Sequence, residues 1–400
     1  MSVLGKNRDF TLLWSAGAAS ALGVQMSAVA YPLIALEVTG SAVQAGVLGS
    51  LALLAQAVLR LPAGALADRW DRRRAMLSCD VVRIVVVVGV IACLLSEVLG
   101  FWILLAAAVV NSACEAVFQP AETAALRRVV RTEDLPRAVA VNEARGHAAA
   151  IGGQPLGGLL LGLGRPWPFA GQLLGLLYSL AATLLIRVPI EGHRSSGNLL
   201  GDIVKGLRWT WEQRVLRVIL SAGVGINLAF SALLFGVVVI AREGGATSAQ
   251  IGLMSGMSSV GGLLGGLAAA WIVGRWKPST VLLAVFWTNS VLIPLMAVHP
   301  TVQVMGVLLA FMLFLTPAAN AILIGFQMAM TPDHLQGRVI SSMRLIITLG
   351  NPLGPFLVGL LIERWGAVAA LVAISLVMLL VTVGSTLSRV MRRLPSLSGG

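Results

Sequence analysis

The stretch GALADRWDRR, residues 64–73, stands between two long apolar runs. Gly64 lets a neighbouring helix approach closely, because glycine carries no side chain. Asp68 supplies a carboxylate that can lie against a helix N-terminus, where anions are favoured by about 0.3–1 kcal/mol. The stretch also supplies basic side chains that can pair with carboxylates or lipid phosphates: Arg69, Arg72 and Arg73. The flanking runs predict two membrane-crossing helices joined by a short charged loop.

The composition of the whole chain indicates an integral membrane protein. Of its 400 residues 57% are hydrophobic and 12% charged, and the mean hydropathy is +0.89. A soluble globular chain is about a quarter charged. This composition excludes a soluble enzyme, a disordered chain and a nucleic-acid-binding domain. The net charge of +12 comes from basic residues between apolar runs, where Lys and Arg act as topology determinants.

No cofactor or metal site is predicted. The three cysteines lie inside apolar runs at no metal-binding spacing, and the four histidines are scattered. A phosphate-binding G-x-x-x-x-G-K-[ST] loop is absent from the sequence, which argues against ATP-driven transport within this chain.

Apolar runs long enough to cross a bilayer occur twelve times, since a spanning helix needs about 20 mostly apolar residues. They lie roughly at residues 10–36, 43–65, 75–95, 101–125, 138–163, 168–188, 216–240, 249–273, 279–298, 301–325, 336–361 and 366–387. The connections are short, so neighbouring helices are expected to be antiparallel.

The distribution of Lys and Arg predicts the orientation. With both termini in the cytoplasm, 22 of these residues lie in inner segments, three in outer segments and four within spans. This asymmetry follows the positive-inside rule and predicts a multi-pass protein of the cell (plasma or inner) membrane with cytoplasmic termini. A signal peptide cleaved after Ala28-Val29-Ala30 is the alternative, but the run before it is long and interrupted by polar residues.

The chain is predicted to divide into six-helix bundles at 1–188 and 215–400. The stretch 189–214 is predicted to be a cytoplasmic linker containing an amphipathic helix. The halves resemble each other at a constant offset of 197 residues, which indicates a parallel duplication. The matching positions are Pro120-Ala121 with Pro317-Ala318, Pro155-Leu156-Gly157 with Pro352-Leu353-Gly354, and Gly162 with Gly359.

Residues 64–73 match the G-x-x-x-D-R-x-x-R-[RK] signature of the major facilitator superfamily at every specified position. The chain thus resembles this family, which implies an all-α membrane protein with twelve transmembrane helices in two parallel-repeat bundles. The resemblance further implies a secondary transporter, not an enzyme, that moves a small molecule by alternating access. Within the family the chain looks like the macrolide and enterobactin exporter branch. The residues that suggest this are Asp80-x-x-Arg83, Phe118-Gln119-Pro120-Ala121, Thr132-Glu133-Asp134-Leu135-Pro136 with Asn142, and Asp333-His334-Leu335-Gln336-Gly337-Arg338-Val339.

The family resemblance implies a conformational latch between the two halves. It would consist of Gly64, Asp68, Arg69, Arg72 and Arg73, with Glu122 as the acidic partner near the inner end of the fourth span. The arginines alternatively serve only to enforce topology. The second half has Gly274-Arg275-Trp276-Lys277 without an Asp, so its own latch is expected to be degenerate.

Ionisable residues inside spans are functional candidates, because each costs at least about 2.5–3.5 kcal/mol in the hydrocarbon region. Glu115 lies near the expected midplane and is predicted to bind and release a proton, with Arg145 as a counter-charge. A carboxylate permanently paired with an arginine is the alternative. Asp80 and Arg83 are expected to pair locally. Neutral residues expected to line the cavity are Asn111, Gln25, Asn227 and Asn320.

These patterns favour proton-coupled efflux of a small amphiphilic or cationic compound, such as a drug, an antibiotic or a siderophore. The proton gradient would supply the energy, the monomer would be the working unit, and membrane lipids but no nucleic acid would be partners. An importer of a small metabolite stays open as an alternative, as do a membrane sensor without transport and an intramembrane enzyme.

Overall fold

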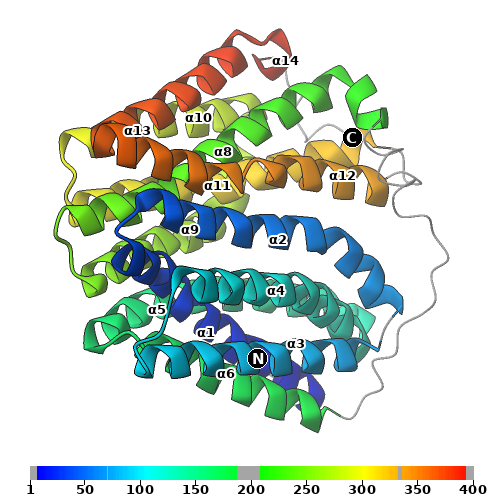
Figure 1. Ribbon diagram of the computed structural model, residues 1–400. Helices are drawn as coiled ribbons and strands as arrows, with labels where there is room; N and C mark the ends of the chain where they lie inside the picture. Colours follow the sequence, from blue (N-terminus) through cyan, green and yellow to red (C-terminus); the bar gives the residue numbers. More distant parts are fainter. Residues whose placement is uncertain (1–6, 70, 187–207, 332–335, 393–400) are drawn as a thin grey trace. The chain divides into compact units, whose positions relative to one another are not determined.

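The computed structural model describes residues 7–69, 71–186, 208–331 and 336–392, and within them the side chains of 61–69 are not described. The chain is all-helical over these ranges (Figure 1). The helices of the first half are α1 (Arg8–Thr39), α2 (Ala42–Arg69), α3 (Arg72–Leu95), α4 (Phe101–Val129), η2 (Thr132–Asp134), α5 (Leu135–Leu163) and α6 (Trp167–Leu185). Those of the second half are α8 (Arg214–Glu243), α9 (Ser248–Arg275), α10 (Pro278–Val298), α11 (Val302–Met330), α12 (Gln336–Leu349), α13 (Leu353–Leu387) and α14 (Arg389–Arg392).

The predicted multi-span helical architecture is confirmed. Within the described ranges, ten segments are long and apolar enough to cross a membrane. One of them runs through two of the predicted spans, because α13 turns at Gly366, whose φ of 80° is strained for any residue with a side chain. The remaining predicted span, 138–163, lies in α5. This helix is more polar than the ten segments, since it carries charged and amide side chains along its length.

The eleventh span is not one continuous helix, although the sequence predicts a single run over 336–361. α12 ends at Leu349 and α13 begins at Leu353, with turns between them. Pro352 has no N–H and restricts the residue before it, so a helix readily ends here. Its counterpart Pro155 lies inside the continuous helix α5. The duplicated prolines therefore act differently in the two halves.

Contacts between Cα atoms divide the chain into two compact units. Unit 1 comprises Met1–Ser196 and Gly245–Gly256, and unit 2 comprises Gly197–Gly244 and Met257–Gly400. The predicted linker falls mostly outside the described residues, although 208–212 is helical. The boundaries at 188 and 215 stay a prediction.

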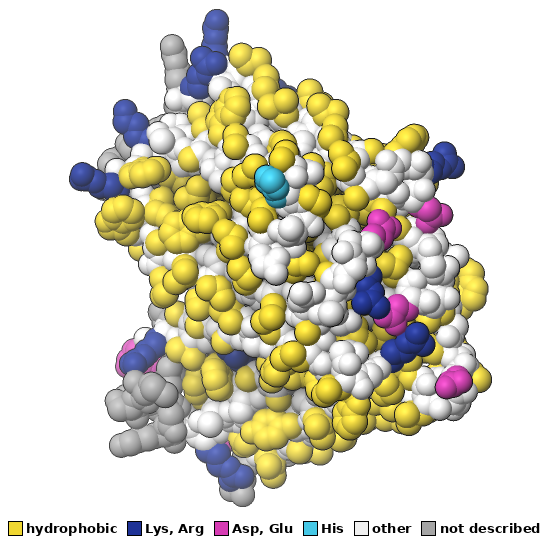
Figure 2. Space-filling model, turned by 90° about the vertical axis from the view of Figure 1, so that its left-hand side faces the viewer, with side chains coloured by type: hydrophobic (Ala, Val, Ile, Leu, Met, Phe, Trp, Pro, Cys, Tyr) yellow, Lys and Arg dark blue, Asp and Glu magenta, His cyan; other side chains and the backbone are white. Residues whose placement is uncertain are grey.

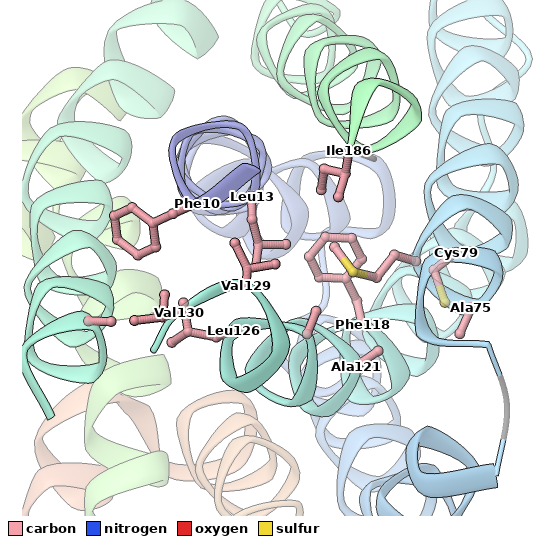
Figure 3. Close-up of a cluster of buried hydrophobic side chains, with 13 residues drawn as sticks. Phe10, Leu13, Ala75, Cys79, Phe118, Ala121, Leu126, Val129, Val130 and Ile186 are labelled. Carbon is pink, nitrogen blue, oxygen red and sulfur yellow. The ribbon is translucent and has the colours of Figure 1, made fainter. Parts of the chain in front are cut away.

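Helix packing within unit 1 brings four helices around one core. α1 packs against α5 and α6, α3 packs against α4 and α6, and α4 also packs against α2. Figure 3 shows the side chains of this core pointing toward one another from α1, α3, α4 and the end of α6. Leu13 and Phe118, for example, are buried there. This packing fixes the relative positions of helices that carry the candidate site.

In unit 2, α13 packs against α8 and α10, α12 packs against α8, and α10 packs against α11. Hydroxyl groups connect α10 with α13. The oxygen atoms of the Ser290 and Thr382 hydroxyls lie 2.7 Å apart, and the Thr382 hydroxyl also contacts the carbonyl of Phe286.

Apolar side chains cover much of the exterior, as expected for helices that face lipid. Figure 2 shows hydrophobic and uncharged side chains over most of one face, with few charged groups. Trp102 at the start of α4 is 76% exposed, and Leu174 in α6 is 70% exposed. Such residues would be costly in water but are favourable against hydrocarbon, with tryptophan preferred at the interface.

Candidate functional site

The charged loop after α2 anchors α3 within unit 1. The Asp71 carboxylate accepts hydrogen bonds from the backbone N–H groups of Arg73 and Arg74 at 2.9 and 3.2 Å, which caps the N-terminus of α3. The Arg73 guanidinium donates to the carbonyls of Thr183 and Leu184 at the end of α6. These carbonyls carry the negative end of the helix dipole, so a cation is favoured there.

The other residues of this motif are only partly described. Arg72 is buried at the start of α3. The side chains of Gly64, Asp68 and Arg69 lie outside the described set, although the backbone of all three is part of α2. The contacts described above for this motif, from Arg73 to the carbonyls of Thr183 and Leu184, thus lie within unit 1.

A buried ion pair joins the middles of α3 and α4. Arg83 Nη1 lies 3.2 Å from Glu115 Oε2, although the orientation of the two groups is not that of a hydrogen bond. The Arg83 side chain is 1% exposed and the Glu115 side chain 17%. Glu115 stands 14 residues from each end of α4, a distance of about 21 Å at 1.5 Å per residue. Glu115 therefore occupies the helix midpoint, as the sequence predicts.

Two neighbours extend this pair to α1 and α2. Arg83 Nη1 also donates to the Ser20 hydroxyl of α1 at 3.1 Å. The second oxygen of Glu115 accepts from the Gln119 amide at 3.0 Å, and the oxygen of that amide accepts from Arg60 of α2 at 3.2 Å. Glu115 thus contacts a guanidinium of α3 and an amide of its own helix, and these two groups connect it to α1 and α2.

The expectation that Asp80 pairs with Arg83 is wrong. The two residues are three apart on α3, and the Arg83 charge acts on Asp80, but the ion pair that Arg83 forms among the described residues is with Glu115. Asp80 instead accepts from the Ser179 hydroxyl of α6 at 2.7 Å. The packing of α4 against α3 brings Glu115 within reach of Arg83, and the packing of α6 brings Ser179 to Asp80.

A second ion pair lies two helical turns further along α4. Arg145 of α5 donates to both oxygens of Glu122, and the contact of its Nη2 with Oε2 is 3.1 Å. The Arg145 side chain is 8% exposed and that of Glu122 7%, and Arg145 also donates to the carbonyl of Trp14 in α1. Arg145 therefore neutralises a carboxylate of α4, but that carboxylate is Glu122, while Glu115 has Arg83.

Gly17 of α1 makes room for the second pair. A Cβ atom at this position would overlap the Arg145 guanidinium and a Glu122 oxygen.

We expect Gly17→Ala to lower the stability of the protein by about 1–3 kcal/mol, since overpacking of a buried site costs this much. The measurement is the thermal unfolding midpoint in detergent micelles. Gly89→Ala in α3 is the control, because a Cβ there meets nothing within 4 Å and alanine favours a helix. Equal midpoints for Gly17→Ala and the wild type would contradict this assignment.

The predicted neutral residues have different surroundings. Asn111 is buried, donates to the Tyr31 hydroxyl at 3.1 Å and accepts from Gln172 at 3.2 Å. Gln25 accepts from Gln154 of α5 at 3.1 Å. Two further residues belong to the second half: Asn227, whose amide donates to the carbonyl of Gly223 in its own helix, and Asn320, which is exposed. Asn111 and Gln25 thus join helices, and a role in transport stays a prediction for all four.

Several residues of this site have no distinctive sequence pattern: Ser20, Ser179 and Gly17. The only sequence signal for the two serines is a hydroxyl in an apolar run, which is common in membrane helices.

The described part of the chain holds no group of three or more His, Cys, Asp or Glu side chains that could bind a metal. Two ion pairs between different helices, Arg83–Glu115 and Arg145–Glu122, lie in unit 1. Among the residues that the structure describes, the buried charged side chains lie on α3, α4 and α5.

Comparisons with known proteins place this fold and motif in one family. Residues 13–238 match the family model of the Major Facilitator Superfamily. The chain is 28% identical over 398 residues to the multidrug efflux pump Tap of Mycolicibacterium fortuitum, covering 94% of this chain and 95% of that protein. It is also 28% identical over 378 residues to Tap of Mycobacterium tuberculosis H37Rv, covering 89% and 88%.

Solved transporter structures share the fold. The nucleoside transporter NupG superposes with a TM-score of 0.75 at 13% identity, covering 97% of this chain and 100% of that one. A D-xylose-proton symporter superposes with a TM-score of 0.69 at 12% identity, covering 98% and 99%. With the family model matching more than half of its length, this chain belongs to the Major Facilitator Superfamily, whose members are secondary transporters rather than enzymes.

Proposed function

We propose that this protein exports small amphiphilic or cationic compounds in exchange for protons. The observation that carries the proposal is the ion pair between Arg83 and Glu115 at the middle of α3 and α4. A carboxylate at this depth is stable when it is either paired or protonated, so its state responds to proton supply and to cargo.

The direction of transport rests on the similarity to the Tap proteins. These proteins are multidrug efflux pumps, and the similarity extends over nearly the whole chain. The likeness to the nucleoside transporter and the sugar symporter is a likeness of fold alone, and fold does not fix direction. Export is therefore favoured over import of a metabolite.

A vesicle experiment tests the proposal. The purified protein is reconstituted into liposomes, and the flux of ethidium, a panel of antibiotics and siderophores is followed with and without an imposed pH gradient. We expect movement of at least one amphiphilic compound against its concentration gradient when protons flow the other way. Equal flux in protein-containing and protein-free liposomes for every compound would overturn the proposal.

We further propose that the protein lies in the cell membrane with both termini in the cytoplasm. Single cysteines at Arg74 and Glu97, near the two ends of α3, test this in a background without the native cysteines. Both positions are exposed. A membrane-impermeant maleimide should label the Glu97 position in intact cells and the Arg74 position in inverted vesicles. Labelling of the Arg74 position in intact cells would reverse the orientation.

The motif at residues 64–73, from the end of α2 to the start of α3, is proposed to act as a latch in the transport cycle, with Asp68 and Arg69 as its central groups and Gly64 allowing close approach. Arg73 ties the start of α3 to the end of α6, which supports a rigid base for such a latch. Glu122 already binds Arg145. It would have to exchange that partner to serve the latch, and the latch is proposed for one state of the cycle only.

A further inference from the structure

Asp80 is a buried carboxyl group without a cation. Its residue is 0% exposed, and its polar neighbour is the Ser179 hydroxyl, 2.7 Å from Oδ2. The other oxygen, Oδ1, has no hydrogen-bond partner. An ionised carboxylate in such surroundings is strongly disfavoured, because desolvation is not offset by a paired charge.

Arg83, one helical turn further along α3, has donors to spare. It is 0% exposed, and Nη1 serves both Glu115 and Ser20. Its Nε and Nη2 have no hydrogen-bond partner. Residues three apart in a helix lie on neighbouring faces, and the Arg83 charge acts on the Asp80 carboxyl group, which makes this group an alternative partner for these donors.

The charges of this cluster do not balance without a proton. Two carboxyl groups, Asp80 and Glu115, share one guanidinium, Arg83. With both acids ionised the cluster carries one uncompensated negative charge in a buried region. With one proton bound it is neutral. Two interacting acids of this kind titrate as a pair rather than as separate residues.

We propose that Asp80 and Glu115 share one proton across Arg83. In the state that the structure shows, Asp80 holds the proton and Glu115 is the anion paired with Arg83. In the second state Glu115 is protonated, and Arg83 turns to the Asp80 carboxylate. The cluster keeps one proton and zero net charge in both states. The less buried Glu115 is the member through which the proton is exchanged with water.

The surrounding charges do not supply another partner. From α4, Glu122 is neutralised by Arg145 of α5. Arg60 of α2 donates to Gln119, whose amide donates in turn to Glu115. The remaining titratable neighbours are the thiols of Cys79 and Cys114 and the phenol of Tyr31, none of which supplies a positive charge. Arg83 therefore has two competing acids.

Infrared spectroscopy of the purified protein in detergent tests this by counting protonated carboxyl groups at neutral pH. The wild type should show the C=O stretch of one buried carboxylic acid. Asp80→Asn should lose this band, because Glu115 alone then neutralises Arg83. Glu115→Gln should lose it as well, because Asp80 then ionises and pairs with Arg83. Glu133→Gln, an exposed carboxylate of η2, is the control and should keep the wild-type band.

Each other result overturns the proposal. A band that survives in Asp80→Asn assigns the proton to Glu115 alone. A band that survives in Glu115→Gln makes Asp80 an isolated acid that shares nothing. Absence of the band from the wild type means that the cluster holds no proton. Arg83→Gln gives a second measurement, since removal of the cation should raise the number of protonated acids from one to two.

This inference deepens the proposed proton coupling and rests on it for its role in transport, but the infrared measurement needs no cargo. A shared proton in the wild type together with flux that ignores a pH gradient would reject the coupling and keep the shared site. Gradient-driven flux in the wild type, together with an unchanged band in Asp80→Asn, would reject the shared site and keep the coupling.

Discussion

Replacing Arg145 by methionine is expected to destabilise the protein by about 3–5 kcal/mol, because Glu122 is then left as a buried charge without a partner. The Glu122 side chain is 7% exposed, so water cannot replace the lost guanidinium. The measurement is the unfolding midpoint in detergent micelles, together with the yield of monodisperse protein. The double variant Arg145→Met, Glu122→Leu should recover most of the loss, since neither charge remains to be desolvated.

An exposed ion pair serves as the control for this result. Arg131 Nη2 lies 3.1 Å from Asp134 Oδ2, and the Arg131 side chain is 69% exposed. Arg131→Met should change the stability by no more than about 1 kcal/mol, because solvent screens such a pair. If the double variant were as unstable as Arg145→Met alone, lost packing rather than an unpaired charge would be the cause.

The second large effect is expected at Glu115, where glutamine should remove the dependence of transport on the pH gradient. For one proton exchanged per cargo molecule, a gradient of one pH unit supports an accumulation ratio of about tenfold, since it is worth about 1.4 kcal/mol. In Glu115→Gln this ratio should fall to about one, while exchange of cargo down its own gradient continues. The measurement is ethidium accumulation in liposomes with the membrane potential clamped at zero.

Glu143→Gln is the matched control for this prediction. Glu143 is exposed on α5 and has the same chemistry as Glu115, but it has no part in the ion pairs of α4. Its accumulation ratio should equal that of the wild type. A Glu115→Gln protein that still concentrates ethidium tenfold per pH unit would show that another group carries the proton.

The sequence predicted the multi-span helical fold, and its motif at residues 64–73 indicated the family that the family model confirms. These features depend on properties of consecutive residues: the length of an apolar run, and the order of Gly, Asp and Arg in residues 64–73. A bilayer fixes the length of a spanning helix, so hydropathy alone locates the crossings. The sequence also identified Glu115 as the acid at the middle of its helix.

Local patterns do not reveal which helix faces meet. The spacing of Asp80 and Arg83 suggested a pair within α3, but the packing of α4 and α6 against α3 gave each residue a partner on another helix. In the same way Arg145 had two candidate carboxylates along α4. Gly17, which attracts no attention in the sequence, leaves the space in which Arg145 reaches Glu122.

The sequence by itself therefore determined that this chain crosses a membrane many times and carries buried acids and arginines. Only the tertiary structure decided the pairing, with Arg83 bound to Glu115, Arg145 bound to Glu122 and Asp80 left without a cation. The physical reason is that hydropathy acts along one helix, whereas an ion pair forms between side chains that the packing of different helices brings within about 4 Å.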